Sequence, residues 1–241
     1  MKSAICIICV RPHSDLVDFY NRFTNYKIFF LIDDYNFNCT YLRLRYPNVQ
    51  FIQISNETCN KAGYKHSSYM PTSSLVFNEI IGWDKAVYYF SKIKTDFDFV
   101  WFFEDDVFIH GEPTVQNIDN KYPLSDIICK DKARESLPGE WAWFWPAITI
   151  HFDRPYFQSP ICAVRMSALL IQHIRDYIDQ HKKMCFIEAM FPSIAHHHNL
   201  LYDTPEEFQG IYWRHDWNPS EINQTGFFHP MKDIMEQNKY R

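Results

Sequence analysis

The sequence has little glycine, no block of basic residues and no long apolar stretch. Glycine accounts for only 6 of 241 residues, so this is not a low-complexity chain. The net charge is −5, whereas non-specific nucleic-acid binding requires a basic surface. No apolar stretch approaches the length of a membrane span. The apolar run at residues 4–10 is short and no small-residue cleavage site follows it, so we do not interpret it as a signal peptide.

The cysteines do not follow a pattern typical of disulfides. There are seven, an odd number, scattered along the chain. Cys6 and Cys9 form a C-x-x-C motif, but in a strand their side chains would point to opposite faces. We interpret them as thiols of the core and expect a reducing compartment. Together with the missing signal and membrane span, this predicts a soluble, cytoplasmic chain.

Predicted strands and helices alternate in the first half of the chain. Strands are predicted at residues 4–10, 27–32, 49–54 and 97–103, and helices from Asp15 (capped by Ser14), at 38–46 and at 75–93 (capped by Ser73 or Ser74). In the second half, a strand is predicted at 126–129 and helices at 167–181 and 183–195. The β-α-β-α-β-α-β order predicts an α/β fold with a mostly parallel sheet and helices on both faces. We see no internal repeat and no linker.

Two predicted strands end in acidic residues. One runs into Asp33 and Asp34, and the other runs into Glu104, Asp105 and Asp106. Parallel strands share one carboxyl edge, where open α/β sheets bind ligands, so we expect the two clusters to lie on one edge. Three adjacent carboxylates repel one another, and a divalent cation is the simplest charge to offset them. A solvated acidic turn is the alternative.

The acidic triplet stands where a known family carries its metal-binding motif. The chain resembles GT-A fold glycosyltransferases, in which a Rossmann-like half ends in a "DxD" motif that holds a divalent metal and the diphosphate of a nucleotide sugar. Here the motif reads Glu104-Asp105-Asp106, with Glu in place of the first Asp. Two later segments are also similar to the family in the expected order: residues 185–192, with an acidic residue for the acceptor site, and residues 228–232, with a metal-binding His.

A fourth similarity, residues 82–86 on the helix before the acidic triplet, places polar residues near the nucleotide. The resemblance implies a single GT-A-like domain. Its nucleotide-sugar-binding half would cover residues 1–108. Residues 109–241 would form the acceptor-binding half and the C-terminal metal-site segment.

The resemblance implies a metal-dependent glycosyltransferase of the hexosyltransferase type. It would move a sugar from a nucleoside-diphosphate sugar, with a UDP-sugar as the first candidate, to a hydroxyl of a glycan or protein-linked glycan. The implied metal ligands are Asp106, Glu104 and His229, a carboxylate and imidazole set that suits Mn²⁺, with Mg²⁺ as the alternative. The residues expected to contact the nucleotide sugar are Arg11, Asp33, Asp34, Asp84, Lys85, Glu104 and Asp105. For Arg11, Asp33 or Asp34, Asp84 and Lys85, the alternative is that they are ordinary polar ends of helices and strands.

Glu188 is the predicted general base that deprotonates the acceptor hydroxyl. It lies in an apolar stretch, where burial would raise its pKa into a useful range. An ion pair with Lys182, Lys183 or an arginine on a helix face is the alternative. Asp153 and Asp216 are reserve candidates for the same role.

Two aromatic clusters and one histidine cluster could have a role in ligand binding. The Trp-rich residues 141–145 could stack on a sugar or form a core strand, and residues 213–217 combine aromatic side chains with a carboxylate. Three consecutive histidines, residues 196–198, cannot converge on one ion in a helix, because neighbours point about 100° apart.

Two other function classes remain open. A sugar nucleotidyltransferase usually has a Gly-rich, basic loop after its first strand, whereas residues 9–13 have no glycine. A non-catalytic carbohydrate-binding protein on a decayed transferase scaffold would bind sugar without metal. The donor sugar, the acceptor, the stereochemistry and the oligomeric state are left open.

Overall fold

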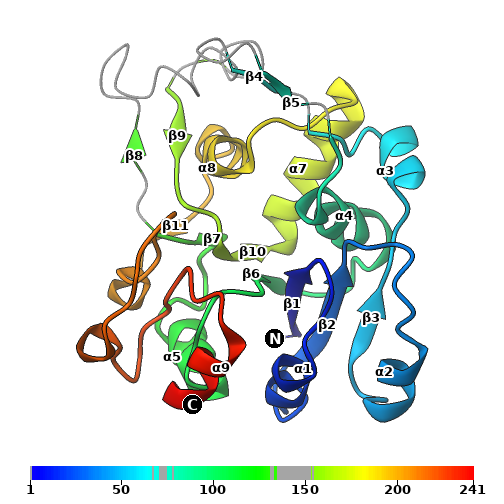
Figure 1. Cartoon of the computed structure of the whole chain (residues 1–241). Coiled ribbons are helices and arrows are strands. Elements are labelled where there is room, and N and C mark those ends of the chain that lie inside the picture. Colours follow the sequence, from blue (N-terminus) through cyan, green and yellow to red (C-terminus); the bar gives the residue numbers. More distant parts are fainter. Residues whose placement is uncertain are drawn as a thin grey trace.

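A seven-stranded sheet forms the centre of the computed structural model (Figure 1). The structure describes residues 2–66, 68–70, 75–77, 79–130, 133–134, 153 and 155–241. The strand order is β11-β7-β10-β6-β1-β2-β3. The pairs β1–β2, β1–β6, β2–β3 and β7–β11 are parallel, and β10 is antiparallel to both β6 and β7. The predicted α/β class with a mostly parallel sheet is confirmed.

The strands of this sheet are β1 (Ser3–Cys9), β2 (Lys27–Ile32), β3 (Gln50–Ile52), β6 (Phe99–Glu104), β7 (Ile127–Ile128), β10 (Ala163–Ser167) and β11 (Tyr202–Asp203). Two small hairpins pair β4 (Ser68–Met70) with β5 (Leu75–Phe77) and β8 (Ala133–Arg134) with β9 (Phe157–Gln158). The α-helices are α1 (Ser14–Tyr20), α2 (Thr40–Arg45), α3 (Asn56–Ala62), α4 (Gly82–Tyr88), α5 (Glu112–Lys121), α7 (Ala168–His181), α8 (Ile187–His197) and α9 (Ile234–Tyr240). Shorter helical turns are η1 (Tyr89–Ile93), η2 (Glu206–Phe208) and η3 (Pro219–Glu221).

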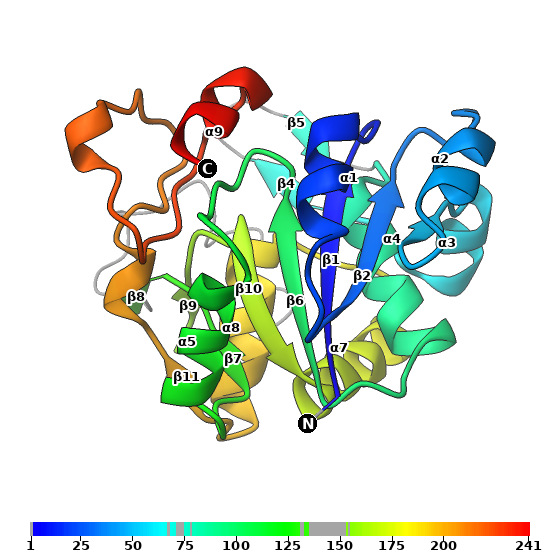
Figure 2. The same ribbon diagram turned by 90° about the horizontal axis from the view of Figure 1, so that it is seen from below.

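Helices cover both faces of the sheet, as predicted (Figure 2). Alternate residues of β1 enter two different apolar clusters, because successive side chains in a strand point to opposite faces. Cys6 belongs to the cluster beneath α4, α7 and α8, and Cys9 belongs to the cluster beneath α1 and α5. The prediction that these two thiols are buried on opposite faces is therefore confirmed, and all seven cysteines are buried.

The helix predicted at residues 75–93 is wrong in its first part. Leu75–Phe77 is strand β5, and the helix begins only at Gly82 and passes into a π-helical turn at Tyr89–Ile93. The start is set by Asp84, whose Oδ2 accepts a hydrogen bond from the backbone N–H of Ile81 at 2.9 Å. The expected caps Ser73 and Ser74 lie outside the described residues.

The first helix also starts differently from the prediction. His13, and not Ser14, is its N-cap, and the His13 side chain accepts from the backbone N–H of Asp15. The other predicted helices are found with shifted ends, and α7 is capped by Ser167, whose hydroxyl accepts from the N–H of Leu170 at 3.1 Å. Strand β10 was not predicted from the sequence.

The chain reverses its direction of travel across the sheet between β1 and β6. After β1 it adds β2 and β3 on one side, and then it returns to place β6 on the other side of β1. In open α/β sheets, ligands bind at the carboxyl ends of the strands at such a switch point. Here that point lies where Ile8–Cys9 and Glu104–Asp105 end their strands.

Candidate metal centre and active site

The two acidic clusters lie on the same edge of the sheet, as the sequence predicted. The backbone N–H of Asp33 donates to the carbonyl of Cys9 at 2.8 Å. The N–H of Asp105 donates to the carbonyl of Ile8 at 3.1 Å. Both clusters therefore flank the carboxyl end of β1, at the switch point.

The C-terminal segment reaches this edge through backbone hydrogen bonds. Phe108, just after the acidic triplet, exchanges two hydrogen bonds with Phe228, at 2.8 and 3.0 Å. The N–H of Met231 donates to the carbonyl of Asp106 at 2.8 Å. These bonds hold His229 beside the acidic triplet, although the two segments are far apart in the sequence.

His229 joins the two carboxylates that were predicted as metal ligands. Its Nε2 lies 3.2 Å from Oε2 of Glu104 and 3.1 Å from Oδ1 of Asp106. Its Nδ1 lies 2.5 Å from the carbonyl of Tyr212, which fixes the ring so that Nε2 faces the carboxylates. Burial of the ring lowers the pKa of His229, but hydrogen bonds with Asp106, Cys162 and Glu104 more than offset this effect and raise the pKa well above its usual value.

Trp83 holds the other oxygen of Glu104. The indole Nε1 on α4 donates to Oε1 of Glu104 at 2.8 Å, while Oε2 faces His229. The Glu104 carboxylate is therefore held from both sides. Residues around Trp83 were expected near the nucleotide, but the contact with Glu104 was not predicted. In the sequence, a Trp on the apolar stripe of a helix is indistinguishable from a core residue.

The donors around His229 fit a divalent cation. Glu104 and Asp106 supply carboxylate oxygens and His229 supplies an imidazole nitrogen within about one hydrogen-bond length of each. Among the described residues, one group of three has its ligand atoms all within 4.8 Å of one another, and it consists of Glu104, Cys162 and His229. Cys162 was not predicted as a site residue. It precedes β10, and its carbonyl accepts from the N–H of Glu104 at 2.9 Å, so the antiparallel pairing places its thiol in the site.

A cavity of about 260 Å³ opens in front of the candidate ligands. Its lining includes Glu104, Asp106, Cys162, Glu188, Trp213, His229 and Lys232. Glu188 lies in the first turn of α8 and is partly buried. Burial raises the pKa of Glu188 to about 7, and the negative charge of Glu104 adds to the rise.

The alternative, an ion pair between Glu188 and a basic residue, is not found among the described residues. No lysine or arginine in the described part of the chain lies within ion-pair distance of its carboxylate, and Lys182 instead lies 3.9 Å from Asp179. A carboxylate with a pKa near neutrality that faces a cavity has the properties of a general base.

Lys232 and an aromatic cluster extend the site. Lys232 is exposed, and its ammonium group has no hydrogen bond or ion pair to any described residue. A second cavity of about 490 Å³ shares Trp213 and Lys232 with the first and adds Asp216 and Trp217. Trp213 is 45% exposed. Trp213 and Asp216 belong to the aromatic segment at 213–217 that the sequence indicated, whereas Lys232 was not predicted as a site residue, because a lone lysine in a loop carries no sequence signal of function.

Four residues expected at the nucleotide sugar are engaged with other protein groups. Arg11 donates to Oδ2 of Asp34 at 2.7 Å, and this hydrogen bond lowers the pKa of Asp34. Lys85 is buried, and its ammonium group lies 2.5 Å from Oδ1 of Asp33. Both pairs lie at the carboxyl edge of the sheet, near the acidic triplet, and their contact with a nucleotide stays a prediction.

Asp84 and Asp105 lie apart from the cavity. Asp84 is fully buried and caps α4, so burial raises its pKa to about 7. Asp105 is exposed and does not line the cavity. Of the reserve bases, Asp153 is exposed, and Asp216 lines only the second cavity.

The other clusters lie elsewhere or outside the described residues. Residues 141–145 belong to the part of the chain that is not described. On α8, His196 packs against Phe157 with ring centroids 4.2 Å apart, and His198 stacks on His173 at 3.7 Å. The consecutive histidines thus face different neighbours, as helix geometry predicts.

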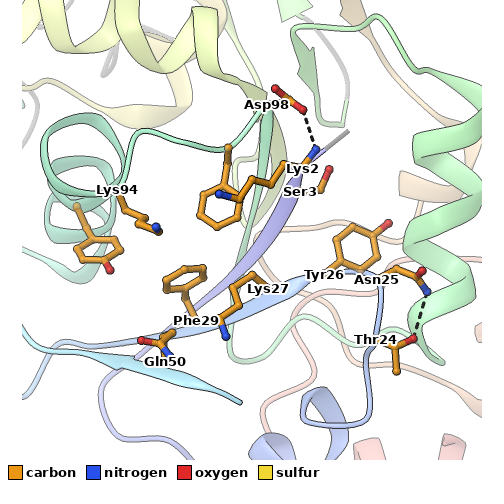
Figure 3. Close-up of a pocket in the computed structure, with 12 residues that line it drawn as sticks. Lys2, Ser3, Thr24, Asn25, Tyr26, Lys27, Phe29, Gln50, Lys94 and Asp98 are labelled. Atoms are coloured by element: carbon orange, nitrogen blue, oxygen red, sulfur yellow. Dashed lines mark hydrogen bonds between the residues drawn. The ribbon is translucent and has the colours of Figure 1, made fainter. Parts of the chain in front are cut away.

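A larger hollow, of about 980 Å³, lies at the opposite edge of the sheet (Figure 3). It is open, and several of its polar groups are already hydrogen-bonded to other protein groups. The backbone N–H of Lys2 donates to Asp98 at 2.7 Å, and Lys27 donates to the carbonyl of Asn48 at 3.1 Å. We therefore take the smaller cavity, where charged groups converge, as the candidate functional site.

Among the described residues, every helix is too short or too polar to cross a bilayer. The chain matches no protein-family model, and no curated protein is significantly similar to it in sequence. Among solved structures, it is similar to the apo form of mouse xyloside xylosyltransferase 1, with a TM-score of 0.42 and 11% sequence identity over 85% of each chain.

Proposed function

We propose that this chain is a metal-dependent glycosyltransferase that moves a sugar from a nucleoside-diphosphate sugar to a hydroxyl acceptor. The observation that supports the proposal most is the convergence of Glu104, Asp106 and His229 at the switch point of a mostly parallel sheet. The same cavity holds a carboxylate, Glu188, whose pKa is raised to about 7 by burial. Candidate metal ligands and a candidate base on one cavity would supply the two groups that a metal-dependent, inverting transfer to a hydroxyl uses.

The leaving diphosphate is the first chemical demand on the site. As the bond from the anomeric carbon to phosphate breaks, negative charge builds on the leaving group and the sugar becomes oxocarbenium-like. A divalent cation held by Glu104, Asp106 and His229 would act as a Lewis acid on the phosphate oxygens. Lys232, whose ammonium group has no described protein partner, would add a second positive charge from the cavity rim.

The acceptor hydroxyl is the second demand, because it must lose a proton. Glu188 accepts that proton in our proposal, and its raised pKa lets a proton transfer near neutral pH. A general base that activates the acceptor directly implies inversion at the anomeric carbon. Trp213, exposed between the two cavities, offers an apolar face on which a sugar ring of the acceptor would stack.

A thermal-shift screen tests the donor side. The full chain is heated with UDP-, GDP- and CMP-sugars, each with a divalent cation and with chelator. Binding to the native state raises the melting temperature by mass action, so one nucleotide class should raise it and chelator should remove the rise. Asp106→Asn should abolish the rise.

Asp96→Asn is the matched control, because Asp96 is an exposed acid that pairs with Lys94 at 2.9 Å near the opposite edge of the sheet. It should leave the shift unchanged. A shift that is equal with and without cation would refute metal dependence. If no sugar were transferred either, the result would favour a carbohydrate-binding protein without catalysis. Formation of a nucleotide sugar from a nucleoside triphosphate and a sugar phosphate would instead identify a nucleotidyltransferase.

A further inference from the structure

The candidate metal centre contains a thiol, which the sequence did not suggest. Cys162 is 6% exposed, and its thiol joins Glu104 and His229 in the group whose ligand atoms lie within 4.8 Å of one another. Its position is fixed by the backbone, because the carbonyl of Cys162 accepts from the N–H of Glu104 at 2.9 Å. The thiol therefore lies beside the place that a cation held by Glu104 and His229 would occupy.

The chemistry of the donors determines which cation the centre favours. Carboxylates alone suit magnesium, calcium and manganese, whereas thiolate and imidazole together favour zinc. One carboxylate, one imidazole and one thiolate supply three protein ligands, and Asp106 lies 3.1 Å from His229 Nε2 as a further oxygen donor. Catalytic zinc sites keep an open coordination position, and here the cavity of about 260 Å³ lies in front of the ligands.

We propose that Cys162 is a ligand of the bound cation, and that it makes the centre prefer zinc to manganese and magnesium. This inference rests on the metal centre of the proposed function, but not on the transfer reaction. It differs from the manganese expectation drawn from sequence, which counted only carboxylates and an imidazole. The thiol adds the soft donor that a hard cation does not use.

Cobalt provides a direct spectroscopic test, because Co²⁺ occupies zinc sites and a thiolate ligand gives it an intense charge-transfer band in the near ultraviolet. The full chain is stripped of metal and titrated with Co²⁺, then with Zn²⁺ as competitor. Mn²⁺ binding is measured separately by electron paramagnetic resonance. The wild-type protein should show the band, and zinc should displace cobalt and remove it.

Cys162→Ser should lose the band and should bind zinc at least about 10–100-fold more weakly. Loss of a residue that only hydrogen-bonds to a metal ligand already weakens metal binding by this factor, so loss of a ligand should weaken it at least as much. Its manganese affinity should change by less than about threefold. Cys162→Ala is the second variant, and melting curves without metal show whether each variant folds. Cys39→Ser is the matched control, because Cys39 is also buried but its thiol contacts Gln53 at 3.1 Å, away from the site.

Each outcome separates this inference from the proposed function. Cys162 is not a ligand if cobalt binds without a thiolate band. The same conclusion follows if Cys162→Ser has the same ratio of zinc to manganese affinity as the control Cys39→Ser. The proposed function would then keep manganese as its metal ion. If the wild-type protein binds none of these cations, the metal centre itself is refuted, together with the metal dependence of the proposed function.

Discussion

The raised pKa of Glu188 predicts that this residue destabilises the native state at neutral and alkaline pH. The perturbation is Glu188→Gln, which keeps the size of the side chain and removes its charge. An unfolded glutamate ionises near 4.5, and burial raises the native pKa to about 7. Between these values the native state still binds a proton that the unfolded state has lost, so the free energy of unfolding falls as pH rises through this window.

The magnitude follows from the size of that rise. One pH unit corresponds to about 1.4 kcal/mol, so full burial would correspond to about 3 kcal/mol. The carboxylate is only partly buried, and solvent screening reduces the effect to about 1–2 kcal/mol. Glu188→Gln should therefore raise the free energy of unfolding by about 1–2 kcal/mol at pH 8, and should change it little at pH 4, where both states are protonated.

Urea denaturation with chelator, at pH 4 and pH 8, measures this difference. Glu57→Gln is the matched control, because Glu57 is exposed and pairs with Lys61 at 2.6 Å, so its loss should cost about 0.2–0.5 kcal/mol at pH 8. A gain for Glu188→Gln of equal size at both pH values would refute the reasoning. So would a loss of stability at pH 8, because it would mean that the charged form is stabilised in the native state.

Three further predictions follow from other parts of the structure. If Glu188 is the base, kcat/KM should fall about 100-fold from its plateau to pH 5, two pH units below its pKa of about 7, as measured by release of nucleoside diphosphate; a flat profile would remove it from this role. Arg165 is 1% exposed and pairs with Asp119 at 2.6 Å, so Arg165→Ala should destabilise the fold by about 3–5 kcal/mol in urea denaturation, and a change under about 1 kcal/mol would contradict the importance of this pair. A Cβ on Gly210 would lie 2.5 Å from the carbonyl of Phe227, so Gly210→Ala should cost about 1–3 kcal/mol and weaken cation binding measured by calorimetry; wild-type affinity would show that the segment before His229 adapts without strain.

The sheet was predictable because its strands carry strong local signals. Residues 28–32 form an unbroken apolar run between Lys27 and Asp33, and β2 has the bounds predicted from it, 27–32. The helix predicted at 75–93 failed because apolar spacing alone could not locate its start. Gly82 and Asp84 mark that start, since Gly82 packs its backbone close to Ile8 and the Asp84 side chain caps the helix.

The candidate site was predictable only where the residue type itself carries a chemical signal. Asp106 and His229 stood out as a carboxylate after a strand and a histidine in a familiar segment, and the structure brings them within 3.1 Å. Cys162 and Trp83 did not stand out, because buried Cys and Trp are ordinary core residues. The antiparallel pairing of β10 with β6 places Cys162 at the site, and the packing of α4 places Trp83 there. No local sequence pattern indicates either position.

The bonds between Phe108 and Phe228 have a consequence for the order in which the protein matures. During synthesis the acidic triplet leaves the ribosome long before His229, so the nascent chain first presents a carboxylate cluster without its imidazole. Only when residues 228–231 dock on the segment after the acidic triplet would a cation at the proposed centre acquire its imidazole donor. Occupancy of that centre would thus report that these two distant segments have reached their native arrangement.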